Sequence, residues 1–234
     1  MGLPRLFCYL SLQERCREHL YITQTSKKYE ILGYYLVVEI QLGGSGTDCL
    51  HGGFPCQEFS IAGYRQGFED KKGRGELFFE LMRMMESKRP RVALFENVKN
   101  LVGHDNGNTF RVICEQLDLL GYHYTYQVLN AMNYGNMAQN RERIYIVAFR
   151  DEADYNKLHW PLSVPLTTTV KDIIDFDNKV DDKYYYTEGK YKGDIYKLLV
   201  EATKDDDINN TAIYQWRRKY VRQNKSGVVP TLTA

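Results

Sequence analysis

The hydrophobic positions of residues 76–121 follow the period of amphipathic helices. In a first group, apolar residues recur every three or four positions: Leu77, Phe78, Leu81, Met82 and Met85. A second group repeats the same spacing: Phe110, Ile113, Leu117 and Leu120. This spacing predicts two helices that each bury one face. For the second helix, Asn108 and Thr109 are the predicted N-cap, and Gly121 is the predicted terminator.

Strand patterns lie between and after these helices. Residues 92–95 form a fully apolar run, which is typical of a buried strand and ends at Glu96. Residues 122–129 and 143–149 alternate apolar and polar positions, which predicts two further strands. In the second of these, one face carries Ile144, Ile146 and Ala148. The alternation of helices and strands over residues 48–150 predicts an α/β fold with parallel pairing in its sheet.

The chain divides into three stretches. Residues 1–47 form an atypical N-terminal segment, and the Gly-Gly-Ser-Gly of residues 43–46 is a turn or linker. That glycine cluster lacks the G-x-G-x-x-G spacing of a dinucleotide-binding loop. Residues 48–150 form the chemical core. Residues 151–234 contain acidic clusters, three consecutive tyrosines and a basic stretch, and we expect a second, smaller domain that is cut short at its end.

Composition and charge narrow the class of protein. With 43% hydrophobic and 26% charged residues over 234 positions, a globular protein is expected. No apolar stretch approaches the ~18 residues of a membrane span, and no signal peptide is present, so we expect a cytoplasmic protein without a membrane partner. The five cysteines show no C-x-x-C spacing, which indicates reduced thiols and no metal site. A formal net charge of +1 means that a nucleic-acid partner would need a local basic patch.

One cysteine follows a glycine-rich turn. Cys56 stands in Gly-Gly-Phe-Pro-Cys-Gln-Glu-Phe-Ser, residues 52–60. The glycines let a ligand approach the backbone closely, and Pro55 fixes the turn. A lone cysteine is more often a core residue, but a core cysteine needs neither the glycines before it nor the polar Gln57 after it. We therefore interpret Cys56 as an exposed thiol and residues 61–75 as a lid.

A carboxylate and two arginines accompany this thiol. Glu96 ends the apolar run, and α/β sheets bind ligands at the carboxyl ends of their strands. The alternative is a structural, salt-bridged carboxylate. Arg141 and Arg143 are predicted to share one face at the start of the last strand. Such a pair is usually a solvated edge, but beside a thiol and a carboxylate it could hold an anion or a base edge.

Together these segments resemble the DNA cytosine-5 methyltransferase family. They are GGFPCQEFS (residues 52–60), RGELFFE (residues 74–80), ENV (residues 96–98) and QNRER (residues 139–143), in the family's order. Residues 221–234 are similar to the family segment that follows the target-recognition region. The resemblance implies an S-adenosylmethionine-dependent methyltransferase fold with a Rossmann-like sheet that is incomplete here. It also implies a catalytic core at 48–150 and a target-recognition domain from about 151 to 216.

The resemblance implies an activity as well. This activity is transfer of a methyl group from S-adenosyl-L-methionine to C5 of a flipped-out cytosine in duplex DNA, in a restriction-modification or phage system. Cys56 would add to cytosine C6, because thiolate addition makes C5 a carbon nucleophile. Glu96 would hydrogen-bond N3 in its protonated form, which apolar surroundings would favour. Arg141 and Arg143 would hold the base and the catalytic loop.

The same resemblance assigns the remaining site residues. Substrate contacts are expected from Gln57, Ser60, Asn97 and Gln139. Cofactor contacts are expected from Pro55, Leu77 and Glu39. The family's Phe-x-Gly-x-Gly cofactor loop and its C-terminal helix have no counterpart in the sequence. We therefore expect a truncated or split enzyme that binds little cofactor alone and could be completed by a complementing chain.

Two other functions fit parts of the pattern. A catalytically inactive fragment could bind DNA through basic residues near the end of the chain, although such a run is often only a solvated strand face. These residues are Arg217, Arg218, Lys219, Arg222 and Lys225, with Tyr220 among them. A tRNA cytosine-5 methyltransferase would share the core motifs, but the length of the recognition region and its lack of a further cysteine motif argue mildly against it. Methylation assays on duplex DNA and tRNA distinguish these readings.

Overall fold

The chain forms two compact units, each described here by itself. The computed structural model describes residues 26–31, 34–43, 46–54, 76–176, 178, 181–190, 193–204, 212–217, 219–224 and 227–231, with the backbone alone for residues 26–48, 76 and 77. The first unit comprises Met1–Leu129 and Glu142–Pro161, and the second comprises Asn130–Arg141 and Leu162–Ala234. These boundaries differ from the division predicted at residue 150.

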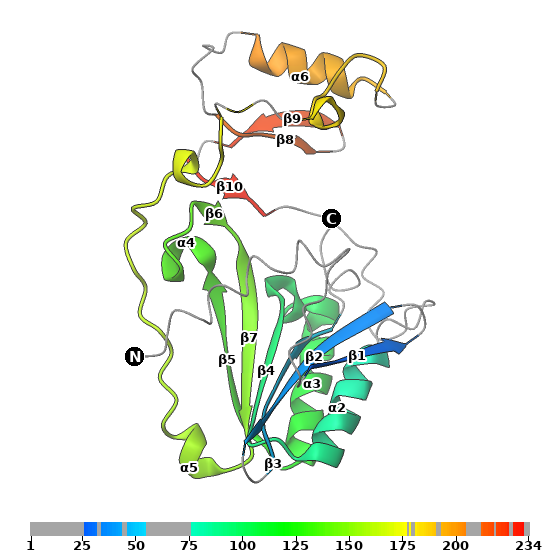
Figure 1. Ribbon diagram of the computed structural model, residues 1–234, viewed down its shortest axis with the longest axis vertical. Helices are drawn as coiled ribbons and strands as arrows, with labels where there is room; N and C mark the ends of the chain where they lie inside the picture. Colours follow the sequence, from blue (N-terminus) through cyan, green and yellow to red (C-terminus); the bar gives the residue numbers. More distant parts are fainter. Residues whose placement is uncertain are drawn as a thin grey trace. The chain divides into compact units, whose positions relative to one another are not determined.

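A six-stranded sheet forms the centre of the first unit, with its strands in the order β1-β2-β3-β4-β7-β5 (Figure 1). The strands are β1 (Ser26–Ile31), β2 (Tyr34–Gly43), β3 (Gly46–Gly53), β4 (Val92–Val98), β5 (His123–Asn130) and β7 (Glu142–Phe149). β3 and β4 are parallel, whereas the pairs β1–β2, β2–β3 and β4–β7 are antiparallel.

The predicted α/β fold is confirmed, and the predicted parallel pairing is found between β3 and β4. The antiparallel pairs were not predicted, and the connections between strands account for the difference. β2 and β3 pair as far as Gly43 and Gly46, so they are close in the sequence, and such strands pair antiparallel. The turn or linker expected at residues 43–46 includes residues 44 and 45, which lie outside the described part of the chain. β3 and β4 are separated by the long segment that contains α2 (Glu76–Lys88), and only such a crossover allows parallel pairing.

Both predicted helices are confirmed. α2 and α3 (Asn108–Leu119) contribute their apolar positions to one core with the sheet (Figure 1). The fully buried helix residues include Phe78, Leu81, Met85, Ile113 and Leu117. The predicted N-cap of α3 is wrong by one residue: Gly107 caps the helix at φ 89°, a conformation that glycine adopts without steric cost. Gly121 follows the helix at φ 71°, as its predicted role as terminator requires.

The two central strands divide their residues between a helix-covered face and an opposite face. Buried Ala93 and Phe95 of β4 pair directly with Ala148 and Ile146 of β7, so all four lie on the side of the core. The predicted face of β7, with Ile144, Ile146 and Ala148, is confirmed, although Val147 and Phe149 on the opposite face are buried as well. β4 alternates between half-buried and buried residues, so the prediction of a fully buried strand is wrong. Within the described residues, α2 and α3 pack against one face of the sheet, and Leu94 on the other face is only half-buried.

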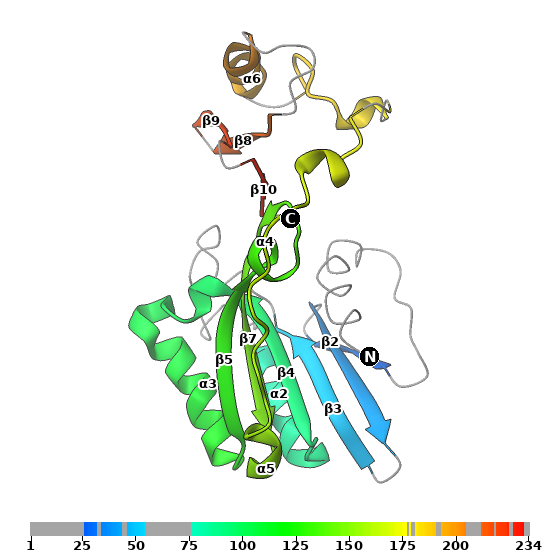
Figure 2. The same ribbon diagram turned by 90° about the vertical axis from the view of Figure 1, so that its left-hand side faces the viewer.

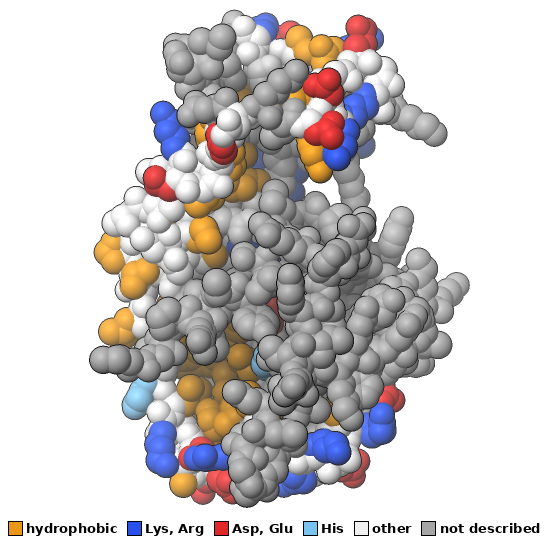
Figure 3. Space-filling view, viewed as in Figure 1, with side chains coloured by type: hydrophobic (Ala, Val, Ile, Leu, Met, Phe, Trp, Pro, Cys, Tyr) orange, Lys and Arg blue, Asp and Glu red, His pale blue; other side chains and the backbone are white. Residues whose placement is uncertain are grey.

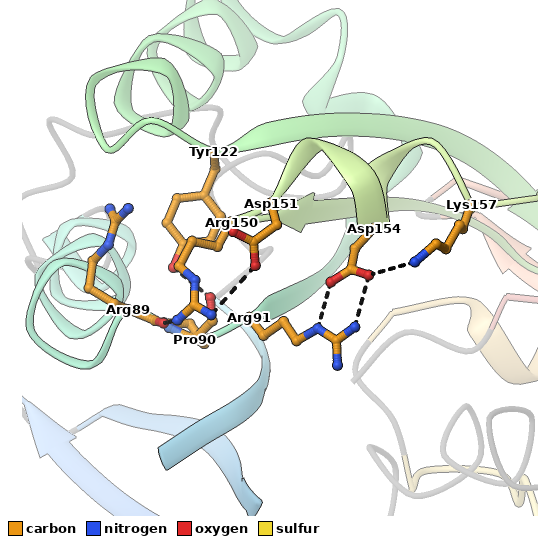
Figure 4. Close-up of polar contacts among 8 residues, drawn as sticks. All are labelled: Arg89, Pro90, Arg91, Tyr122, Arg150, Asp151, Asp154 and Lys157. Atoms are coloured by element: carbon orange, nitrogen blue, oxygen red, sulfur yellow. Dashed lines mark hydrogen bonds and ion pairs between the residues drawn. The ribbon is translucent and has the colours of Figure 1, made fainter. Parts of the chain in front are cut away.

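A polar cluster ties the segment after β7 to the start of β4 (Figure 4). Arg91 donates hydrogen bonds of 2.5 and 2.8 Å to the two carboxylate oxygens of Asp154 in α5 (Glu152–Tyr155). These bonds lower the pKa of Asp154 to about 2. The Tyr122 hydroxyl donates to the Pro90 carbonyl at 2.7 Å, and burial raises the pKa of this tyrosine.

The second unit has short elements around a small apolar cluster. They are α4 (Ala131–Tyr134), β6 (Gln139–Asn140), η5 (Val170–Asp172), η6 (Asp182–Tyr184), α6 (Ile195–Thr203), β8 (Tyr214–Arg217), β9 (Tyr220–Gln223) and β10 (Val229–Pro230). β6 pairs in parallel with β10, and β8 pairs with β9 as a hairpin. The buried cluster comprises Ala138, Val170, Val228 and Val229. Figure 2 shows α6 alongside the hairpin. None of the helices that the structure describes is long and apolar enough to cross a membrane.

Candidate active site

Three strand ends meet at one edge of the sheet. β3 and β4 are parallel, so their carboxyl ends lie at the same edge, where Phe54 follows β3. β7 runs antiparallel to β4, and its first residues reach that edge as well: Arg143 pairs with Val98. Segments from three separate parts of the sequence are thereby brought together at the position where α/β sheets bind ligands.

Glu96 and Arg143 form an ion pair at this edge. Tyr145 is the residue of β7 directly across from Glu96, and Arg143 lies two positions from Tyr145 in β7. Glu96 and Arg143 are therefore diagonal neighbours on the same face of the sheet, the one opposite α2 and α3. The Arg143 Nε lies 2.9 Å from the Glu96 Oε1, and the two side chains are 12% and 20% exposed. Arg143 is therefore largely buried rather than part of a solvated edge.

This contact bears on the two possibilities that the sequence left open for Glu96, a ligand-binding carboxylate and a structural, salt-bridged one. The Arg143 guanidinium lies within hydrogen-bonding distance, so Glu96 has an ion-pair partner. The apolar sequence before Glu96 does not reveal which residue lies across the sheet from it. The protonated form that the resemblance implies stays a prediction.

Asn97 lies on the other face of β4, within the core. It is 2% exposed. Its Nδ2 donates to the Phe54 carbonyl oxygen at 3.3 Å, and its Oδ1 accepts from the Val98 backbone N–H at 2.8 Å. Phe54 is itself buried and packs edge-to-face on Phe78 with the ring centroids 5.3 Å apart. Asn97 thus anchors the backbone two residues before Cys56, a position that favours a positioning role over the direct substrate contact expected for it.

A second ion pair lies beside the first, and no pattern in the sequence indicated it. Lys99 Nζ lies 2.8 Å from the Glu142 Oε1. Lys99 follows the last residue of β4, and Glu142 is the first residue of β7. The two are 43 positions apart in the chain. Both side chains are about half exposed, so the pair adds at most about 1 kcal/mol to stability.

Arg141 and Gln139 belong to the second unit and are not placed with Glu96. Arg141 lies between β6 and β7 rather than in a strand, so the prediction that it shares a strand face with Arg143 is wrong. The strand is interrupted at Arg141 because its backbone N–H bonds within a tight turn. This N–H donates to the Gln139 carbonyl at 3.1 Å and to the Asn130 Oδ1 at 3.2 Å. Arg141 is 6% exposed, and Gln139 pairs with Val229 of β10.

Several predicted site residues lie outside the described part of the chain. These are Pro55, Cys56, Gln57 and Ser60, together with the lid predicted at residues 61–75. Leu77 lies in α2, where its backbone alone is described. Their predicted roles therefore remain predictions.

Glu39, for which a cofactor contact was expected, lies within β2, and its backbone pairs with His51 in an antiparallel ladder. Only its backbone is described, so its cofactor role stays a prediction.

The family of the chain follows from comparison with known proteins. The model of the C-5 cytosine-specific DNA methylase family matches residues 22–232. The chain belongs to the C-5 cytosine-specific DNA methylase family. The resemblance seen in the sequence motifs is thus confirmed. Membership of this methylase family implies a methyl donor and a mixed α/β fold such as the one observed.

Named relatives of this chain agree with the family. The chain is 57% identical over 187 residues to the Type II methyltransferase M.Bsp6I of Bacillus sp. (strain RFL6), covering 80% of this chain and 57% of that protein. It is 45% identical over 134 residues to M.HhaI of Haemophilus parahaemolyticus, covering 57% of this chain and 40% of that protein. The chain spans about half the length of the curated relatives it matches.

A solved structure of a methyltransferase from Entamoeba histolytica, EhMeth, is similar at a TM-score of 0.44 and 17% identity. The aligned region covers 60% of this chain and 42% of the EhMeth chain. A similarity this low carries no argument about function.

Proposed function

We propose that this methylase transfers a methyl group from S-adenosyl-L-methionine to C5 of cytosine in duplex DNA, with Cys56 as the nucleophile. The observation that carries the proposal is the ion pair of Glu96 and Arg143 at the edge of the sheet where β3 ends at Gly53, three residues before Cys56 in the sequence. M.Bsp6I, which matches 80% of the chain, bears a Type II methyltransferase name. A restriction-modification or phage system is the proposed context.

The chemistry of cytosine explains why a thiol is needed. C5 of the ring does not attack a methyl donor unaided. The Cys56 thiolate adds to C6, and the electron pair of the C5–C6 bond makes C5 nucleophilic. After C5 has received the methyl group, loss of its proton restores the double bond and expels the sulfur. S-adenosylmethionine supplies the electrophilic methyl group. The cytosine must leave the duplex stack for Cys56 to reach C6.

Glu96 and Arg143 act together in this proposal. Arg143 fixes the orientation of the Glu96 carboxylate before the base arrives. Glu96 then takes up a proton and hydrogen-bonds cytosine N3, which withdraws electrons from the ring and favours addition at C6.

Asn97 is a positioning residue in the same proposal. Its hydrogen bond to the Phe54 carbonyl fixes the backbone immediately before Pro55 and Cys56. A nucleophile must lie within about 3–3.5 Å of the atom that it attacks, so small displacements are costly. Arg141, whose backbone is fixed by the turn before β7, is proposed to hold the base or the catalytic loop.

The proposed division of labour follows the sequence. Residues 48–150 would carry catalysis, and residues from about 151 to 216 would recognise the DNA target. Because the chain spans 57% of the length of M.Bsp6I, we propose that a complementing chain can contribute to the cofactor site. The cytoplasm is the proposed compartment.

Label transfer tests this function. The chain is incubated with S-adenosylmethionine carrying a tritiated methyl group, alone and with a fragment of M.Bsp6I from outside the matched region. Unmethylated duplex DNA and tRNA are the two substrates. We expect label in DNA as 5-methylcytosine and none with Cys56→Ser. Label in tRNA alone would assign the tRNA reaction instead. DNA binding without label in either mixture would favour the inactive DNA-binding fragment.

A further inference from the structure

The β8–β9 hairpin carries two different faces. Gln215 pairs directly with Arg222, and Arg217 pairs directly with Tyr220. Directly paired residues project to the same side of a sheet, and so do residues two positions apart. One face therefore carries Gln215, Arg217, Tyr220 and Arg222, and we call it the polar face. The other face carries Tyr214, Trp216, Val221 and Gln223.

The polar face is the more open of the two. In β9, half-buried Val221 stands between exposed Tyr220 and exposed Arg222. Tyr220 is 54% exposed, which is high for an aromatic side chain in a strand. α6 contacts β9 and lies along the hairpin (Figure 1). On the polar face, Arg217, Tyr220 and Arg222 are exposed and Gln215 is half-buried. On the other face, Tyr214, Trp216 and Val221 are half-buried and Gln223 is exposed. The polar face is therefore the more accessible of the two.

The charge of the hairpin stands out from the rest of the chain. Residues 214–223 contain four Lys or Arg residues and no Asp or Glu, whereas the formal net charge of the whole chain is +1. Elsewhere, Figure 3 shows positive and negative side chains interspersed. On α6, the carboxylate of Glu201 is paired with Lys204 at 2.6 Å, within the helix. The hairpin is thus a local basic patch of the kind that a nearly neutral protein needs to bind nucleic acid.

The side chains of the polar face suit base edges as well as phosphates. Arginine matches the O6 and N7 acceptors of guanine, and glutamine matches N6 and N7 of adenine. Arg222 Nη2 donates to the Gln215 Oε1 at 3.5 Å, so the amide and the guanidinium lie side by side. An amide and a guanidinium placed together can address neighbouring base pairs.

The spacing of the polar face also suits DNA. Alternate residues of an antiparallel strand are about 6.8 Å apart, which equals about two base-pair steps of about 3.4 Å each. A two-stranded ribbon fits the B-DNA major groove, which is about 12 Å wide. Gln215 and Arg217 therefore match positions two base pairs apart, with Arg222 and Tyr220 beside them on the second strand.

We propose that the polar face of the β8–β9 hairpin enters the major groove of the DNA substrate and reads base edges through Gln215, Arg217 and Arg222. This assignment rests on the proposed function, since it takes duplex DNA as the substrate. It makes these three residues determinants of the target sequence, with Tyr220 in contact with the groove beside them.

Binding selection with matched variants tests the assignment. The full chain selects duplexes from a pool with a randomised centre, and bound sequences and affinities are compared for four variants. Gln215→Ala and Arg217→Gln alter the polar face. As a control for Gln215→Ala, Gln223→Ala removes a glutamine side chain from the opposite face. As a control for Arg217→Gln, Lys197→Gln removes one positive charge from an exposed position of α6. Circular dichroism checks that each variant is folded.

We expect each polar-face variant to lose preference at one or two base pairs and to bind the wild-type site about fivefold to a hundredfold more weakly. Gln223→Ala and Lys197→Gln should keep the wild-type preference. A uniform loss across all sequences, with a shallower salt dependence, would overturn base reading in favour of phosphate contact alone. Equal effects from the two control variants would overturn it as well. If the wild-type chain bound no duplex, the proposed function itself would fail together with this assignment.

Discussion

Replacing Asn97 by alanine tests whether its hydrogen bond to Phe54 positions the backbone that precedes Cys56. Asn97→Ala removes the donor to the Phe54 carbonyl and the acceptor of the Val98 N–H, at a site that is 2% exposed. A buried polar group that loses its partner costs about 1–3 kcal/mol. For a unit of this size each kcal/mol corresponds to about 2–4 °C. We therefore expect the Tm to fall by roughly 2–12 °C.

The loss of this anchor should also slow the chemistry. A displacement of the nucleophile by about 1 Å can cost about 10²-fold in rate, so the rate of adduct formation at Cys56 should fall while DNA affinity stays near that of the wild type. Thermal unfolding and single-turnover adduct formation measure the two effects. Asn108→Ala, at an exposed position of the same compact unit, is the control. An Asn97→Ala variant no less stable and no slower than this control would refute the positioning role.

Three further predictions follow from other contacts. Glu96→Gln should slow methylation by about 10²–10⁴-fold with DNA affinity nearly unchanged, and an equal loss of binding in filter assays would instead indicate a structural Glu96. Asp154 has a folded pKa of about 2, below its ordinary 3.8, so its bonds to Arg91 contribute stability above about pH 4 that is lost as the pH falls through 2. The Tm difference between wild type and Asp154→Asn should therefore shrink between pH 5 and pH 2, as measured by calorimetry, and a constant difference would contradict the shift. Tyr122→Phe leaves the Pro90 carbonyl without its 2.7 Å donor and should lower the free energy of unfolding by about 1 kcal/mol in urea titrations; an unchanged midpoint would show that water replaces it.

The sequence predicted the local structure well where one periodic pattern decided it. The apolar spacing at Leu81 and Met85 and at Ile113 and Leu117 places these residues in helices that bury them. The alternation after Arg143 likewise predicts a strand with Ile146 on its buried face. These features depend on neighbours within one or two turns, which a pattern can report.

Pairing across the sheet was not predictable in the same way. β4 pairs in parallel with β3 as predicted, but its other neighbour, β7, runs antiparallel, and helices cover one face of β4 in the described residues. The contact of Glu96 with Arg143 depends on that register, as does the pair of Lys99 and Glu142. Register joins residues more than 40 positions apart, and no local pattern specifies it.

The motif residues show the same division. The Glu-Asn-Val motif predicts that Glu96 and Asn97 belong to the site, but only the alternation of β4 shows that they project to opposite faces. Glu96 therefore contacts Arg143, whereas Asn97 reaches the backbone of Phe54. Likewise, the motif places Arg141 beside Arg143, but a turn at Arg141 separates it from the strand.

Trapping of the covalent adduct tests the central claim most directly. In duplex DNA containing 5-azacytosine, a ring nitrogen replaces C5, so a thiolate can add to C6 without methyl transfer. The chain is incubated with this duplex, digested and analysed by mass spectrometry, with unmodified duplex as the control. We predict a nucleotide adduct on the peptide that contains Cys56 and on no other cysteine peptide, and its loss in Cys56→Ser. An adduct on Cys49 or Cys114, or an adduct that survives in Cys56→Ser, would contradict the assignment of Cys56 as the nucleophile.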